Sequence, residues 1–322
     1  MAFVLSDLVA YIEENKGDLM TKAILGYTAW DHVTIIDGVK SEIKVPDLES
    51  TVPFQVGTGC NAVTTSGSTT ISQTSLATSP IEFAEKICLN SLEDYYTQKY
   101  LPKGANVDSV AIFSDILNRK IAQIALQVEQ VMFQGNTAYT NSTVLKQIHG
   151  FIKRVDDASD EVIATAQASV TTSTVRTIVN EIIFQKIPSA AYQNNPILLM
   201  GMENFRLLLQ KLWEDNAFNY FPGAADLDKH MITYPGTNVK IYGIAGLNND
   251  TPVDTGALNS TVKNRMICTY KENLLVGTDL QADMKSLETW YEKKDRSIYI
   301  YGRMRLGTAI RYTDHVVTYA NT

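Results

Sequence analysis

The sequence is poor in the residues that carry most metal and redox chemistry, with 3 cysteines and 4 histidines in 322 residues. Cys60, Cys88 and Cys268 are odd in number, far apart and in no CxxC pair, which argues against a disulfide framework. The histidines are scattered, without the HExxH or His-x-His spacing of a metal site. We therefore expect no metal and no cofactor, and a chain made and kept reduced in a cytoplasm.

Long apolar runs and an excess of positive charge are also missing. No run of about 20 apolar residues occurs, so we expect no membrane span. The net charge of -7 and the isoelectric point near 5.2 argue against a protein whose main task is to grip nucleic acid. The first residues lack the basic start of a signal peptide, and we expect a short amphipathic helix there. At 45% hydrophobic and 20% charged residues, the composition is that of an ordinary globular protein.

Charge of either sign is absent from residue 50 to residue 81, a stretch crowded with Ser and Thr. A disordered low-complexity loop is one interpretation. Disorder usually comes with net charge, however, whereas Thr, Val and Ile favour strands. We therefore expect an extended β-hairpin over 38–84 that is ordered by docking on another copy of the chain. Residues 34–50 alternate and turn at Asp37 and Gly38, so a strand and a hairpin are expected there. Four residues of the hairpin are candidate contacts with a neighbour: Thr69, Ile71, Thr74 and Leu76.

The clearest helix pattern covers 108–134, where apolar residues recur every three or four positions. Asn106 or Asp108 can cap the start, and Gly135 is placed as a C′ residue. At 1.5 Å per residue the helix would be roughly 35–40 Å long. The pattern lasts about three heptads, so we expect a core-packing helix rather than a coiled coil. Its apolar stripe comprises Val110, Phe113, Leu117, Ile121, Ile124, Val128 and Val131.

From residue 151 onward the pattern changes to shorter helices and strands in alternation. Helices are predicted over 171–188, ended by Pro188, and over 202–216. Buried strands are predicted at 195–201, 238–246, 265–270, 273–280 and 315–319. The fold class that follows is α+β.

Near the end, "SIYIYGRMRLGTAIRY" (297–312) alternates strictly through its first half and predicts a strand with two different faces. One face is apolar, with Ile298, Ile300, Met304 and Leu306. The other carries Tyr299, Tyr301, Arg303 and Arg305, residue types that surfaces use to bind other surfaces. We expect this face to lie against a neighbouring subunit. An inward face over packaged DNA is the alternative.

Three acidic residues, Asp279, Asp283 and Glu288, are the strongest candidates for catalysis or metal binding. A soluble α/β enzyme that uses them is one hypothesis. We favour a solvated helix start, because acidic residues in a first turn suit the helix dipole. No GxSxG, Walker A or GxGxxG element accompanies them. The lack of a catalytic constellation favours a structural role.

The order of these elements resembles the major capsid proteins of tailed bacteriophages, which have the Hong Kong-type (Johnson) fold that encapsulins share. The most specific similarity lies in an NLxxGTDL element and a GxxxLGxxI strand. These comprise Asn273, Leu274, Gly277, Thr278, Asp279 and Leu280, then Gly302, Leu306, Gly307 and Ile310. The resemblance implies an N-terminal arm (1–37), an extended loop (38–84), a peripheral domain with a spine helix (85–150), a mainly axial domain (151–264), and an axial return with C-terminal peripheral strands (265–322).

The function that the resemblance implies is a non-enzymatic shell of pentamers and hexamers that encloses double-stranded DNA, in a virion assembled in the host cytoplasm. Its partners would be other copies of the chain, a separate scaffolding protein, a portal, and DNA bound without sequence specificity; decoration proteins are left open. An encapsulin-like compartment that loads an enzyme cargo is the alternative of the same fold.

Overall fold

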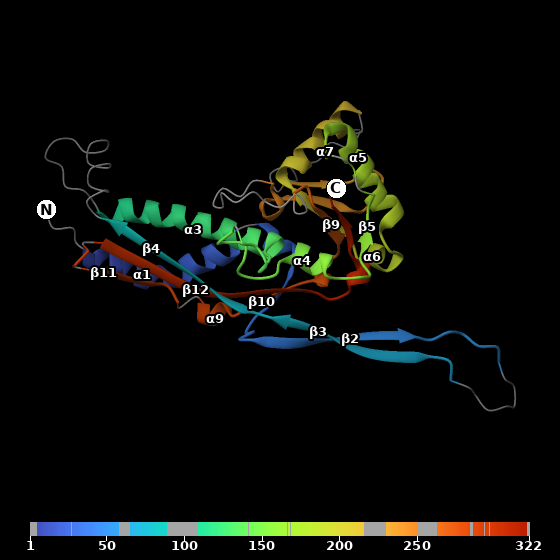
Figure 1. Cartoon of the computed structure of the whole chain (residues 1–322), viewed down its shortest axis with the longest axis horizontal. Helices are drawn as coiled ribbons and strands as arrows, with labels where there is room; N and C mark the ends of the chain where they lie inside the picture. Colours follow the sequence, from blue (N-terminus) through green and yellow to red (C-terminus); the bar gives the residue numbers. More distant parts are fainter. Residues whose placement is uncertain are drawn as a thin grey trace.

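Two packed units and one projecting hairpin make up the structure, a computed structural model (Figure 1). It describes residues 5–26, 28–57, 65–88, 109–140, 142–165, 167, 169–215, 230–249, 263–283, 286–292, 294–295 and 297–320. We call the parts the elongated unit, the six-stranded unit and the arm. None of the helices in these ranges is both long and apolar enough to cross a membrane.

The elongated unit is a five-stranded sheet covered on one face by two long helices, α1 and α3. Strand β12 is its centre, because it pairs antiparallel with β11 over 297–301, with β4 over 297–306 and with β10 over 306–310. The elements are α1 (Leu5–Leu25), α3 (Ser109–Gln134), β1 (Thr34–Ile36), β4 (Ser79–Cys88), β10 (Leu274–Thr278), β11 (Glu288–Glu292) and β12 (Ser297–Ile310). Short helices α4 (Phe151–Asp156), α9 (Leu280–Asp283), η1 (Thr28–His32) and η4 (Lys271–Asn273) connect them.

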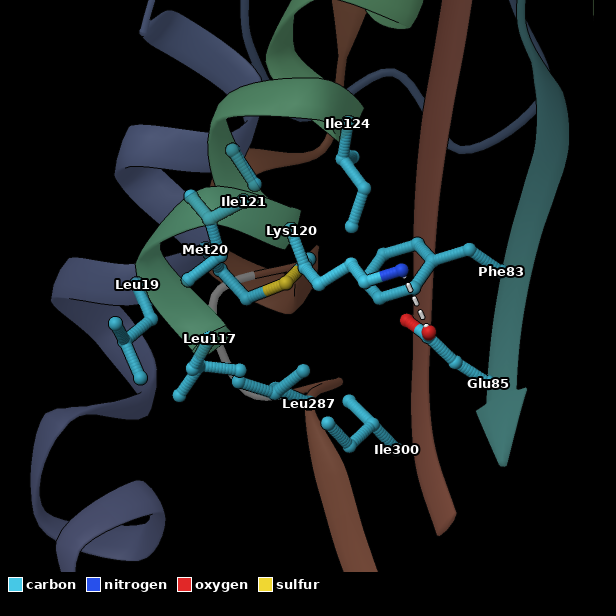
Figure 2. A pocket seen from close by; sticks show the side chains of 11 residues that line it. Leu19, Met20, Phe83, Glu85, Leu117, Lys120, Ile121, Ile124, Leu287 and Ile300 are labelled. Atoms are coloured by element: carbon cyan, nitrogen blue, oxygen red, sulfur yellow. Dashed lines mark ion pairs between the residues drawn. The ribbon is translucent and has the colours of Figure 1, made fainter. Parts of the chain in front are cut away.

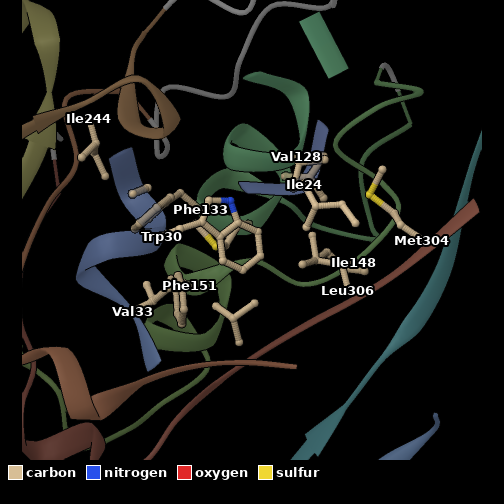
Figure 3. Packing of buried hydrophobic residues seen from close by; sticks show 14 of the residues in the cluster. Ile24, Trp30, Val33, Val128, Phe133, Ile148, Phe151, Ile244, Met304 and Leu306 are labelled. Carbon is tan, nitrogen blue, oxygen red and sulfur yellow. The ribbon is translucent and has the colours of Figure 1, made fainter. Parts of the chain in front are cut away.

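The predicted alternation in β12 is confirmed, because Ile298, Ile300, Met304 and Leu306 are all buried. They pack with the apolar stripes of α1 and α3 in one large core (Figure 3). This core continues into the six-stranded unit, since Ile244 and residues of its neighbouring strands belong to it. The two units are therefore joined by shared packing.

Helix α3 confirms the predicted spine helix almost to the residue, as it covers Ser109–Gln134. Leu117, Ile121, Val128 and Val131 are buried, whereas Ile124 is half-buried. The proposed cap residues and the side chains of Val110 and Phe113 lie outside the described part. Gly135 follows the helix, but its φ is not among the left-handed angles. Glycine is required there by close approach, because a Cβ would overlap the carbonyl oxygens of Val131 and Ile148.

The N-terminal segment contains a helix where the sequence predicts one, and this helix is long rather than short. Residues Leu5–Leu25 form one helix that packs along α3 and buries Leu19, Met20, Ala23 and Ile24. β1 then pairs in parallel with β10. The predicted hairpin at Asp37 and Gly38 is therefore wrong, because the strands on either side of that turn pair with different partners. Only the turn itself is present, with Gly38 at φ 79°.

The six-stranded unit has the strand order β5-β13-β9-β6-β8-β7, with helices packed against the sheet. The predicted strands and the 202–216 helix are confirmed, and the 171–188 helix becomes a π-helix at Glu181. The elements are β5 (Val162–Ile163), α5 (Thr172–Asn180), η2 (Glu181–Lys186), α6 (Ser189–Gln193), β6 (Ile197–Gly201), α7 (Met202–Glu214), β7 (Met231–Thr233), β8 (Lys240–Ile244), η3 (Ala245–Leu247), β9 (Met266–Thr269), η5 (Thr313–His315) and β13 (Val317–Tyr319).

The arm is a hairpin of β2 (Glu42–Thr51) and β3 (Ser68–Ala77), paired antiparallel over its whole length. An extended hairpin is present as predicted, but it covers 42–77 rather than 38–84, because residues 79–84 belong to β4 and pair with β12. It projects from the end of the sheet and is packed on neither unit along its outer part (Figure 1). Its second strand continues through Thr78 directly into β4 of the elongated unit. The arm is therefore a continuation of the sheet rather than a loose loop.

Candidate intersubunit surfaces

The base of the arm is fixed to its own subunit by apolar and polar contacts. Leu76 is fully buried in a small cluster with Leu275 and Ala309. Arg311 forms an ion pair with the buried carboxylate of Asp47, which also accepts a hydrogen bond of 2.7 Å from Thr74 Oγ1. Leu76 cannot contact a neighbour, because no part of its side chain is exposed, and this corrects its place among the candidate contacts. Thr74 is half-buried and already bonded within the chain.

The outer half of the arm has the opposite character, because its apolar side chains are exposed. Leu48 and Ile71 lie directly opposite each other and are 62% and 69% exposed. Val52, Phe54 and Val56 follow at two-residue spacing and are 77%, 104% and 93% exposed. Within the described residues nothing covers this apolar ribbon, which is a larger exposed apolar run than a solitary soluble chain normally keeps.

The polar face of β12 collects the four predicted side chains on one side of the sheet. Tyr299, Tyr301 and Arg305 are half-buried there, and Arg303 is exposed. The strand period of two places them together, as the sequence predicts. The neighbouring strands add residues that the sequence reasoning missed, above all Trp290 on β11 and Lys86 on β4.

Trp290, Tyr299 and Lys86 form a ladder across three strands. The rings of Trp290 and Tyr299 are stacked, with centroids 5.5 Å apart and planes within 5°. Tyr299 donates a hydrogen bond of 2.9 Å to Asp295, and Lys86 Nζ lies 2.8 Å from the same carboxylate. The hydrogen bond from Lys86 lowers the pKa of Asp295. The alternation in "ETWYE" (288–292) is the signal that could have identified β11 as a strand, where the sequence reasoning expected acidic helix residues.

The two arginines of this face have partners in their own subunit. Arg303 Nε lies 3.8 Å from a carboxylate oxygen of Glu82, its cross-strand neighbour on β4. The Arg305 guanidinium donates a hydrogen bond to the carbonyl oxygen of Lys40 at the arm base. The face is thus held in place before any neighbour arrives, and its contact with a second subunit stays a prediction.

The three acidic candidates do not form one cluster. Asp279 and Asp283 are buried, with 7% and 4% exposed, whereas Glu288 is exposed on β11 opposite Tyr301. The expected solvated helix start is wrong, because α9 is a short helix packed against β12. Asp283 accepts a hydrogen bond of 2.9 Å from the backbone N–H of Arg305, and burial raises the pKa of this carboxyl to about 6.

The role of Asp283 is to fasten α9 to the central strand. In the part of the chain that the structure describes, no three His, Cys, Asp or Glu side chains are grouped to hold a metal ion. The three acidic residues therefore form no assembled acid/base site.

Several solved structures resemble this arrangement over most of its length. A chain of the satellite phage P4 procapsid is 12% identical, with a TM-score of 0.51 over 94% of this chain and 96% of that one. A chain of Mycobacterium phage Ogopogo is 11% identical, with a TM-score of 0.55 over 91% of both chains. A chain of the capsid of an empty GTA particle is 11% identical, with a TM-score of 0.53 over 92% of this chain and 90% of that one.

No family model matches the sequence, and no curated protein matches it either. The structural similarity nevertheless spans nearly the whole chain in each case. The chain therefore has the Hong Kong-type capsid fold, as the order of its elements predicted.

Proposed function

We propose that this chain is the major head protein of a tailed bacteriophage, and that it assembles into the pentamers and hexamers of an icosahedral shell around double-stranded DNA. The capsid fold over at least 91% of the chain supports the proposal. The observation that carries it is the arm, whose exposed apolar outer half points away from its own subunit. Exposed apolar surface of this kind marks a site of contact with another molecule.

In this proposal the elongated unit is the peripheral domain, with α3 as its spine helix, and the six-stranded unit is the axial domain. The arm is the extended loop that lies on a neighbouring subunit. Helix α1 and strand β1 belong to the peripheral domain in this proposal, because α1 packs on α3 and β1 pairs with β10.

The polar face of β12 is the second proposed contact between subunits. Aromatic and arginine side chains there form a half-exposed surface that is already ordered by Asp295, Glu82 and Lys40. Prior ordering lowers the entropy cost of binding. The candidate contacts on the arm are then Thr69 and Ile71, which are exposed, rather than Leu76.

The proposed partners are other copies of the chain, a separate scaffolding protein, a portal, and DNA. Contact with DNA would be weak and without sequence specificity, because a chain of net charge -7 does not condense a genome by charge. The role is structural rather than catalytic. In this proposal the protein is found in the virion, after assembly in the host cytoplasm.

Electron microscopy of the purified protein, with analysis of what the particles contain, tests the proposal. We expect closed shells of uniform size that hold long DNA when they are purified from cells producing the complete phage. Particles that contain an enzyme instead of DNA would favour the compartment shell of the same fold. A chain that remains monomeric at high concentration in size-exclusion chromatography, also with its scaffold, contradicts both.

A further inference from the structure

The core of the elongated unit is open along one edge, beside β4. Within the described residues β4 pairs with β12 alone, so its other side is a free sheet edge. Phe83, Ile81, Ile124 and Val144 are packed against the core there but remain only partly buried. The layer between the sheet and α3 is therefore not closed at this edge.

A cleft of about 120 Å³ enters the layer at this point. Its walls come from β4, from the second half of α3 and from the loop that follows α3, with Ile81, Phe83, Val128, Val131 and Val144 among them. Glu82 is the only charged residue among those that line it, and its uncharged polar members are Gln127 on α3 and Thr143 and Gln147 on the following loop. The cleft thus fits an uncharged, apolar group.

Further along the same edge an ion pair spans a second, smaller pocket of about 20 Å³. Lys120 on α3 reaches across to Glu85 on β4, with Nζ and the carboxylate oxygen 2.7 Å apart (Figure 2). The apolar side chains behind this pair, such as Met20 and Leu117, are buried. The cleft beside Ile81 is larger, and among the described residues no ion pair joins β4 to α3 across it.

We propose that the cleft receives Phe54 from the arm of a second copy of the chain, with residues 52–57 lying along the free edge of β4. This inference rests on the proposed function, because a shell places copies of the chain around every subunit. It names the residue that anchors the arm and the place that receives it.

Size and charge support this occupant. An enclosed apolar cavity of about 150 Å³ binds benzene, so an open cleft of about 120 Å³ can hold one phenyl ring. Phe54 is the largest side chain of the exposed apolar ribbon and is wholly exposed. The stretch around it carries no charge, so its burial in an apolar cleft leaves no charged group unpaired. Val52 and Val56, at two-residue spacing, suit an extended segment beside a sheet edge.

The arm of the same subunit does not supply this ring. Its base is pinned by Leu76 and by the ion pair between Arg311 and Asp47. From that base its paired strands, each 10 residues long, run away from both units (Figure 1). A second copy is therefore the source.

Cross-linking in assembled particles tests the proposal. Subunits with Phe54→Cys and subunits with Gln147→Cys, each in a Cys60→Ser, Cys88→Ser background, are co-assembled and treated with a short bismaleimide. We expect covalent pairs of subunits in denaturing gels. Particles built from either variant alone should give none, and neither should particles that pair Phe54→Cys with Lys186→Cys in the six-stranded unit.

The critical concentration for assembly provides the second readout. We expect Phe54→Ala to raise it about 30-fold, the equivalent of a 2 kcal/mol hot spot. Val144→Trp, which fills the cleft, should do the same, and the double variant should be little worse than either single one. Trp213→Ala is the matched control, because this exposed aromatic lies on α7, far from the cleft.

The outcomes separate the two proposals. Particles that form normally but show no pairing of positions 54 and 147 overturn this inference and leave the shell function intact. The same holds if Phe54→Ala assembles as the parent does. If the unmodified chain never assembles, the proposed function is wrong, and so is this inference.

Discussion

At the scale of single residues, Glu129 shows how a charged position can be structural. It lies on α3 and is fully buried, and its Oε1 accepts a hydrogen bond of 2.7 Å from the backbone N–H of Gly246 in η3. Burial raises the pKa of this carboxyl to about 7, and backbone N–H groups of Ala29, Ala245 and Gly246 oppose that rise. Glu129 therefore joins α3 to the six-stranded unit. Burial of its ionised carboxylate costs free energy, so this contact weakens as the pH rises.

We expect Glu129→Gln to flatten the pH dependence of stability. The folded pKa of about 7 lies above the ordinary value of 4.5, so the parent loses stability as pH rises from 4.5 to 7. Over this range the Glu129 carboxyl lowers the free energy of unfolding by about 3 kcal/mol. The glutamine amide does not titrate, so the variant does not have this loss. Urea unfolding of unassembled subunits at pH 5 and pH 8 measures the difference. Parallel pH profiles for variant and parent would contradict the expectation.

Arg303 and Arg305 are each held by one side-chain contact within their own subunit. An exposed pair such as Arg303 with Glu82 contributes about 1 kcal/mol or less to folding. We expect the double variant Arg303→Ala, Arg305→Ala to fold with an unchanged far-UV spectrum and to lose its particles, because in the proposed shell these side chains face a neighbour. Arg206→Ala, an exposed arginine of α7, is the control.

Electron microscopy and the DNA content of the particles read out this variant. Normal empty shells with altered DNA packing would favour the inward-facing alternative. Normal shells with normal DNA content would leave the pair as solvated charges, which contradicts both interpretations of the face.

At the scale of elements, local periodicity predicts individual helices and strands, whereas their pairing partners depend on contacts between distant parts of the chain. The alternation of β12 and the three-and-four spacing of α3 are properties of short stretches, and both elements appear where expected. The parallel pairing of β1 with β10 joins residues more than two hundred positions apart, and no local pattern encodes it. Leu76 resembles its exposed neighbours in sequence, yet it is buried because the arm base meets β10 and β12.

The candidate surfaces likewise combine residues that a local pattern predicts with residues that only long-range pairing brings together. The polar side of β12 could be predicted because every second residue of a strand shares a face. Its partners Trp290 and Lys86 could not, since they arrive from other strands through the register of the sheet. The edge cleft depends on three separate elements and left no signal in the sequence.

The spine helix supplies a prediction at this scale. Leu117 is buried and Ile124 is half-buried, so their truncation should differ in cost. We expect Leu117→Ala to lower the free energy of unfolding by about 2–5 kcal/mol and Ile124→Ala by about half as much. Denaturant unfolding of unassembled subunits checks both. Equal losses, or none, would show that α3 does not pack with this face toward the core.

At the scale of the whole molecule, the arm separates folding from assembly. Its base is part of the subunit's core, whereas its outer end contributes little to it. A deletion of residues 58–78 would remove β3 together with Leu76 and would damage the fold. Replacement of residues 52–67 by a short Asn-Gly turn keeps the full β2–β3 pairing.

We expect this shortened chain to fold with the parent's melting temperature and to form no closed shells. Circular dichroism of the subunit and electron microscopy of the assembly mixture measure the two properties. A parent-like yield of shells would show that the outer arm is not needed between subunits.

The direct passage of β3 through Thr78 into β4 has a mechanical consequence. A tensile load applied to the tip of the arm runs along β4, which is paired with β12 from Ser79 to Cys88. Antiparallel hydrogen bonds lie perpendicular to their strands. Such a load therefore shears the β4–β12 ladder, and all of its hydrogen bonds resist together. In unzipping, by contrast, the hydrogen bonds would break one after another. A subunit pulled by its arm should yield at the contact with its neighbour before its own sheet ruptures.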